Sequence, residues 1–309
     1  NAAGLNLAAS TMGGTFSGTA TAGNITQTGA LDIEGVTTLV TSGPGADIDL
    51  AANGTGNAFT GKLLITTNET SSNANDAYAT IHGGTTDLKI GLSTIEGNLT
   101  LLSGGEITDE GIATVEGTLT ATTNQLHKII TLNQLAVTGA LTLAPNGTGA
   151  VTIVNAAGLI LATSTMGGTF SGTATNGHIT QSGDLTITGA ATFITATTSK
   201  NIILDQNNEF ASSVTMKAGT GGSDAFNNIT FVDTNGVDLV SSTPSAGDLF
   251  IDASTDLDVD GALIITATTG NITQGSELAV GTTSTFTTSA SDGTITLNDA
   301  DNTFTGAVA

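Results

Sequence analysis

The acidic segment IDASTDLDVDG, residues 251–261, holds the densest group of side chains that could do chemistry. Its four carboxylates are Asp252, Asp256, Asp258 and Asp260. With Leu257 and Val259 pointing inward, the last three share one outer face and lie about 6.8 Å apart along a strand. Such a face fits a solvated acidic stripe, a Ca²⁺ site of hard oxygen ligands, or a carboxylate pair for glycoside hydrolysis. We favour the solvated stripe and keep Ca²⁺ open, so no catalytic, cofactor-binding or metal-binding residue is predicted.

The three histidines, His82, His127 and His178, show no pattern typical of a metal or catalytic site. They are widely separated and lack the His-Glu-x-x-His spacing of zinc enzymes. His178 stands where a second copy of the same segment has Asn24, so a polar surface residue is accepted there. We expect isolated surface histidines.

Other nucleophiles and phosphate-binding loops are not indicated either. Serine and threonine are abundant, but no histidine and aspartate are arranged around any of them. The Gly-Gly pairs at 13–14, 83–84 and 221–222 lack the Gly-Lys-Ser/Thr ending of a phosphate loop and are interpreted as turns. Cysteine is absent, which excludes disulfides and thiol chemistry. The sequence therefore predicts a protein that is not an enzyme.

Seven Asn-x-Thr sequences are potential acceptors of N-linked glycans. They begin at Asn24, Asn53, Asn68, Asn98, Asn146, Asn228 and Asn271. The inward position of Ile25 places Asn24 and Thr26 on the solvent face. A chain rich in Asn and Thr also produces such sequences by chance, so both explanations stay open.

The charge balance excludes several classes of partner. The chain of 309 residues has 5 Lys and no Arg against 27 acids, a formal charge of −22. Nucleic-acid binding and docking on anionic membranes both need basic residues. No apolar run approaches the roughly 18 residues of a membrane span. Because the sequence does not open with Met or a signal-like segment, we expect a mature fragment or a part of something longer.

Composition predicts an all-β protein. There are 61 Thr and 41 Gly but only 3 Pro, and charged residues make up 10%. Threonine is β-branched and favours strands, whereas Gly and Asn favour turns. A hydrophobic content of 38% and a mean hydropathy of +0.21 argue against disorder.

An internal repeat defines the organisation. Residues 1–38 and 155–192 match at 28 of 38 positions without a gap. We therefore predict one continuous domain, 1–309, made of two repeat units, 1–154 and 155–308. A finer repeat, Gly-Asn-Ile-Thr-Gln, occurs at 23–27 and 270–274, with a variant at 177–181. About 23 residues after each lies an aliphatic strand (48–50, 202–204 or 295–297) that leads to Phe59, Phe210 or Phe304.

Short alternating strands at this spacing indicate a parallel β-solenoid of roughly 20–24 residues per coil. Each coil lays its strands on those of the previous one, burying aliphatic side chains such as Ile25, Ile179 and Ile272. A β-propeller is the rival all-β fold, but two-residue hairpin turns are few and a blade-like aromatic signature is missing.

The strings GNITQTGALDIEG, NAFTG and DNTFTG resemble the repeats of filamentous-haemagglutinin-like exoproteins. The resemblance covers most of the chain and implies a right-handed β-helix shaft of a secreted adhesin or surface filament. LTLAPNGTGAV and DLAANGTGNAF are, more weakly, similar to segments of phage tail fibres.

Three functions follow. The first is a structural or adhesive shaft segment of an extracellular fibre, whose partners are further copies of itself, end to end, and cell-surface glycans or neighbouring cells. The second is a carbohydrate-binding or carbohydrate-degrading β-helix, for which a chain with no Trp and 4% aromatics offers little sugar stacking. The third is a phage-type fibre, which would be an intertwined trimer. We favour the first.

Overall fold

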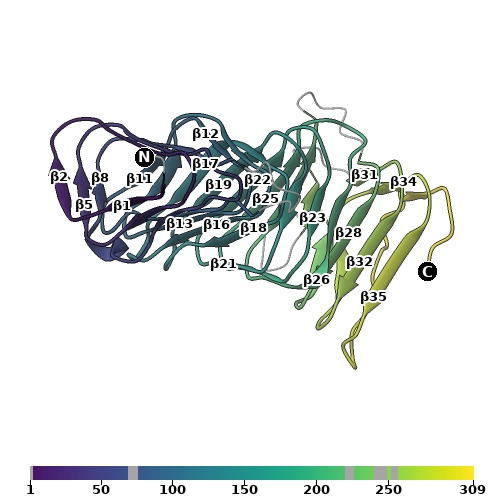
Figure 1. The fold of residues 1–309 in the computed structure, drawn as a ribbon. Coiled ribbons are helices and arrows are strands. Elements are labelled where there is room, and N and C mark those ends of the chain that lie inside the picture. The colour runs from purple at the N-terminus through teal and green to yellow at the C-terminus, as the bar shows by residue number, and fades with distance from the viewer. Residues whose placement is uncertain (1–2, 69–75, 220–225, 240–248, 252–256) are drawn as a thin grey trace. The chain divides into compact units, whose positions relative to one another are not determined.

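The computed structural model describes residues 3–68, 76–219, 226–239, 249–251 and 257–309. The chain divides into two compact units, Asn1–Ala156 (unit 1) and Ala157–Ala309 (unit 2). Both are parallel β-solenoids, as predicted, and the paired strands of each unit are all parallel. Figure 1 shows successive strands of unit 2, such as β26, β28, β32 and β35, lying side by side.

Unit 1 arranges its strands in three rows. The first row is β1 (Leu5–Leu7), β4 (Ile25–Gln27), β7 (Ile48–Leu50), β10 (Ala79–His82), β13 (Leu99–Ser103), β16 (Leu119–Thr123) and β18 (Leu141–Ala144). The second contains β3 (Phe16–Ala20), β6 (Thr37–Thr41), β9 (Leu63–Thr66), β11 (Leu88–Ile90), β12 (Ser93–Ile95), β14 (Ile107–Asp109), β15 (Ala113–Val115), β17 (Ile130–Val137) and β19 (Val151–Asn155). The third is β2 (Ser10–Met12), β5 (Leu31–Ile33) and β8 (Ala58–Phe59), and a short 3₁₀ turn spans Gly54–Gly56.

Unit 2 repeats the plan. Its first row is β20 (Leu159–Leu161), β23 (Ile179–Gln181), β26 (Ile202–Phe210), β28 (Ile229–Asp233), β32 (Leu263–Ala267) and β35 (Ser284–Thr288). The second is β22 (Phe170–Ala174), β25 (Ala191–Thr195), β27 (Val214–Ala218), β30 (Leu249–Ile251), β29 (Val237–Leu239) and β33 (Ile272–Gln274). The remaining strands are β21 (Ser164–Met166), β24 (Leu185–Ile187), β31 (Leu257–Val259), β34 (Leu278–Val280) and β36 (Thr303–Phe304).

The strand register gives the length of a coil. Leu99 pairs with Leu119, 20 residues on, and Ile25 pairs with Ile48, 23 residues on. These steps fall in the predicted range. Longer steps also occur, because Ile48 pairs with Ala79, 31 residues on. The extra residues lie between strands, so the stacking of one coil on the next is kept.

Alternation of apolar and polar residues builds the core, as the sequence predicted. Ile25, Ile179 and Ile272 are fully buried. In unit 2, an aromatic column of four rings, Phe170, Phe193, Phe210 and Phe231, fills the interior, with centroids of neighbouring rings 5.3, 6.1 and 5.4 Å apart. Tilted, edge-on and stacked ring pairs of this kind add stabilisation beyond the area that they bury.

One predicted strand is wrong. Residues 295–297 were expected to form a full strand, but Ile295 makes only an isolated bridge to Ile272 and is 44% exposed. The backbone contact of this segment with β33 is limited to Ile272, whose carbonyl accepts a hydrogen bond from the Thr296 amide (2.8 Å).

Candidate functional site

The most specific polar arrangement in unit 1 is a buried pair of amide side chains. Gln27, the last residue of the Gly-Asn-Ile-Thr-Gln motif, and Asn57, in the next coil, exchange two hydrogen bonds of 3.0 Å each. Asn57 also accepts a hydrogen bond from the Leu31 amide (2.9 Å) and donates one to the His82 carbonyl (2.9 Å). A single side chain thus connects three successive coils and satisfies polar groups that would otherwise be buried without partners.

Unit 2 contains this amide pair twice more. Gln181 and Asn208 exchange hydrogen bonds of 2.8 and 3.0 Å, and Asn208 accepts from the Leu185 amide at 3.0 Å. Gln274 and Asn302 are paired in the same way. Sequence reasoning found the Gln and the Asn-x-Phe strings such as NAFTG and DNTFTG, but it did not predict that this Asn is the partner of the Gln in all three copies.

A second polar arrangement, the outer ladder, follows a corner of the coils. In unit 2, the Asn201 amide donates to His178 Nδ1 (2.9 Å) and the Asn228 amide donates to Asn201 Oδ1 (3.1 Å). The Ala262 amide donates in turn to Asn228 Oδ1 (2.8 Å). In unit 1, Asn24 Oδ1 accepts from the Asp47 amide at 3.0 Å. Asn24 and His178 therefore do the same structural work, which explains why one can replace the other.

The outer ladder also explains several Asn-x-Thr sequences. Asn24, Asn98, Asn228 and Asn271 each accept a hydrogen bond from a backbone amide of the following coil. These hydrogen bonds thus account for Asn at these positions independently of any glycan. Glycosylation at these sites stays a prediction.

The acidic segment lies only partly within the described residues. Asp252 and Asp256 lie outside them, whereas Asp258 and Asp260 are exposed on either side of the buried Val259, as predicted. Burial of part of its surface, and then the nearby Asp260, raise the pKa of Asp258. Across the described residues, no three His, Asp or Glu side chains gather closely enough to hold a metal ion. The Ca²⁺ alternative stays a prediction.

The expectation of surface histidines is correct for His127 and His178 and wrong for His82. The first two are exposed, and His127 Nδ1 lies 2.8 Å from Thr148 Oγ1. His82 is only 6% exposed, because the 3₁₀ turn at Gly54 lies against it. A Cβ at Gly54 would come within 2.2 Å of His82 Cβ, so only glycine permits this contact. Burial lowers the pKa of His82 from its usual 6.5.

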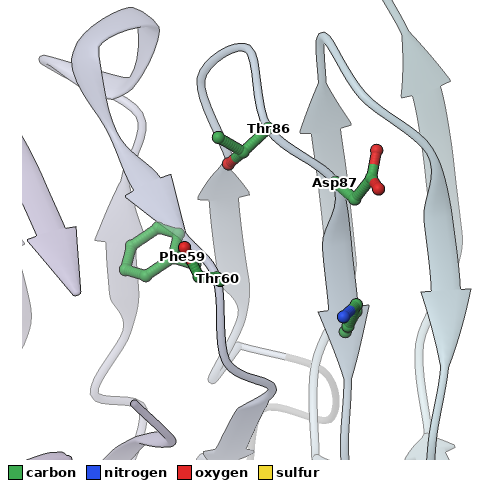
Figure 2. A pocket seen from close by; sticks show the side chains of 5 residues that line it. Phe59, Thr60, Thr86 and Asp87 are labelled. Carbon is green, nitrogen blue, oxygen red and sulfur yellow. The ribbon is translucent and has the colours of Figure 1, made fainter. Parts of the chain in front are cut away.

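A shallow hollow of about 310 Å³ in unit 1 is lined by Phe59, Thr60, Thr86, Asp87 and Lys89 (Figure 2). Two of its polar side chains already bind neighbouring backbone: Thr86 Oγ1 donates to the Gly83 carbonyl (3.0 Å), and Asp87 Oδ1 accepts from the Glu106 amide (2.9 Å). Phe59 is fully buried and offers no ring face to a sugar. The hollow therefore gives no specific support for a carbohydrate site.

The described residues include no helix that is long and apolar enough to cross a membrane.

Comparison with protein families gave one match. A family model described as repeats of unknown function (DUF5649) matches residues 1–66, 74–144, 148–217 and 227–309, together most of the chain. No curated protein and no solved structure matched the chain. The first two matched segments lie within the first sequence repeat, and the third crosses the boundary between the repeats at 154/155.

Proposed function

We propose that this chain, which belongs to the family described as repeats of unknown function, is a structural or adhesive shaft segment of a long extracellular fibre and has no catalytic role. The observation that carries the proposal is that the polar side chains of the amide pairs and the outer ladder hold neighbouring coils together. The amide pairs and the outer ladder join one coil to the next in register, and contacts of these two kinds occur in both units. Repeats of this kind lengthen a solenoid without adding chemistry.

End-to-end association of copies is the second part of the proposal. In the described part of unit 1, β1 pairs only with β4, and β3 only with β6. Leu5 and Phe16 on these two strands are half-buried, whereas the equivalent Leu159 and Phe170 in unit 2 are fully buried. A strand added at such an edge would complete the backbone hydrogen bonds and cover these apolar side chains. We propose that a further copy of the same repeat, added end to end, supplies it.

The charge and the polar exterior support an extracellular, hydrated setting. A formal charge of −22 keeps a repetitive β protein soluble and discourages lateral aggregation. Contacts with cell-surface glycans through the Thr- and Asn-rich exterior are part of the adhesive proposal.

Immunogold electron microscopy of native material tests the proposal. Antibodies against this chain should label extended fibres at many positions along the shaft. Label on compact, isolated particles would contradict it.

Two assays separate the alternatives. Release of reducing ends from any member of a polysaccharide panel would favour a carbohydrate-degrading β-helix instead. A mass of three chains in an intertwined assembly would favour a phage-type fibre.

A further inference from the structure

Asp233 is a buried acid at the end of β28 in unit 2. Its side chain is 0% exposed. In the strand register, it lies beside Asn208 of β26 on one side and Ala267 of β32 on the other. Its paired neighbours in the two adjacent coils are thus a neutral amide and a methyl group, and neither provides a positive charge.

The two carboxylate oxygens of Asp233 are unequally satisfied. Oδ1 accepts a hydrogen bond from the Phe210 amide at 3.2 Å. Oδ2 is buried and has no hydrogen-bond partner. A buried oxygen without a partner is costly, and the cost is much higher when it carries negative charge.

The surrounding charges add to this cost. Among the described elements packed against Asp233, β26 carries Asp205 and Glu209, both exposed, whereas β32 carries no titratable side chain. The Glu209 carboxylate repels a charge on Asp233, although burial is the larger effect. Burial raises the pKa of Asp233 to about 6, against the hydrogen bond from the Phe210 amide, which lowers it.

We propose that Asp233 is a pH-sensitive element that makes unit 2 more stable in mildly acidic surroundings than at neutral pH. Protonation removes the buried charge from the contact between β26, β28 and β32. The coils that these three strands form are thereby held more tightly.

The direction of the effect follows from linkage. The folded state binds the proton more strongly than the unfolded state, in which the carboxyl has its ordinary pKa of 3.8. The stabilisation is therefore fully present below pH 3.8 and is lost as the pH rises through about 6. From the two pKa values, the unfolding equilibrium constant rises by up to about 100-fold between these limits.

The test compares the full-length chain with its Asp233→Asn variant by denaturant unfolding from pH 4 to pH 7.5. Asn fits at this inward position, since Asn208 occupies the paired position in the adjacent coil. The variant should be more stable than the wild type at pH 7.5 and should lose this advantage toward pH 4. Asp205→Asn, which removes an exposed acid from the neighbouring strand β26, is the matched control and should keep the pH dependence of the wild type.

A direct titration makes the test independent of the variant's folding. Carboxyl ¹³C NMR of the wild-type chain should show Asp233 titrating near pH 6. Titration at or below its ordinary value of 3.8 would overturn the proposal. Equal pH dependence of unfolding in the wild type and Asp233→Asn would also overturn it.

Discussion

At the scale of single residues, polar side chains inside the coils determine which coil stacks on which. Asn208 bonds to Gln181, to the Leu185 amide and to the Val232 carbonyl (3.1 Å), so it fixes the offset of three coils at once. With an aliphatic side chain in its place, a slip of two residues, which keeps the same side chains on the inner face, would break no specific bond at this position. The buried amide pair therefore contributes specificity of stacking as well as stability.

Replacing Asn208 by Ala should destabilise unit 2 by about 3 kcal/mol, because it leaves several buried donors and acceptors without partners. Asn207→Ala is the matched control, since Asn207 is its exposed neighbour. Denaturant unfolding measures both variants. Surface substitutions usually change stability by no more than about 0.5 kcal/mol. If Asn208→Ala loses no more stability than this relative to the control, the amide pair is not needed.

His82 should titrate below its usual pKa of 6.5, because burial disfavours the charged imidazolium. Since the folded-state pKa is lowered, the stability from neutral His82 is present above pH 6.5 and is lost as the pH falls. This direction is opposite to that of Asp233. Imidazole ¹⁵N NMR through a pH titration measures it, and a midpoint at or above 6.5 would contradict the buried position.

Single-residue features were the hardest to predict from the sequence. Local alternation assigns His82 to the outside because it follows the inward Ile81, but the Gly54 turn, far away in the chain, lies against it. The partner of Gln27 lies 30 residues away at Asn57. The recurrence of Asn-x-Phe after each Gly-x-Ile-Thr-Gln was visible in the sequence, but the repeat alone did not show that the two amide side chains pair across coils.

At the scale of elements, short strands with period-2 alternation account for the fold. Ile179 is typical: it is fully buried and lies in register between Leu159 and Ile202 of the neighbouring coils. Positions of this kind could be predicted because Gly and Asn mark the corners and one face of each strand is aliphatic. The lengths of the corners could not be predicted, since extra residues between strands leave the strand pattern unchanged.

Ile179→Asp should break its coil, since the carboxylate would be buried among aliphatic side chains with no positive partner. The expected loss is at least about 4 kcal/mol, the range typical of a buried unpaired charge. Ser182→Asp places the same charge at an exposed position three residues on and should be tolerated. Limited proteolysis and circular dichroism compare the two, and a folded Ile179→Asp variant would show that the inward register is wrong.

At the scale of the whole molecule, repetition and negative charge are the dominant features. Gln27 and Gln181, which occupy matching positions of the two repeats, form the same kind of amide pair, with Asn57 and Asn208, which lie outside the 38 aligned positions. A repeated set of coil-to-coil contacts is what a shaft needs, because each coil must bind its neighbours and nothing else. The repeats do not identify an adhesive target, because recognition of a specific target requires a feature that is not repeated.

Electron cryo-microscopy of native material, at a resolution that separates coils, is the most direct test of the shaft role. We expect a continuous fibre with a layer spacing of about 4.8 Å, the distance between neighbouring strands. A longer period of 154 residues, the offset between the two repeats, should be superimposed on it. Discrete compact particles without this layer line would contradict the proposed role as a fibre shaft.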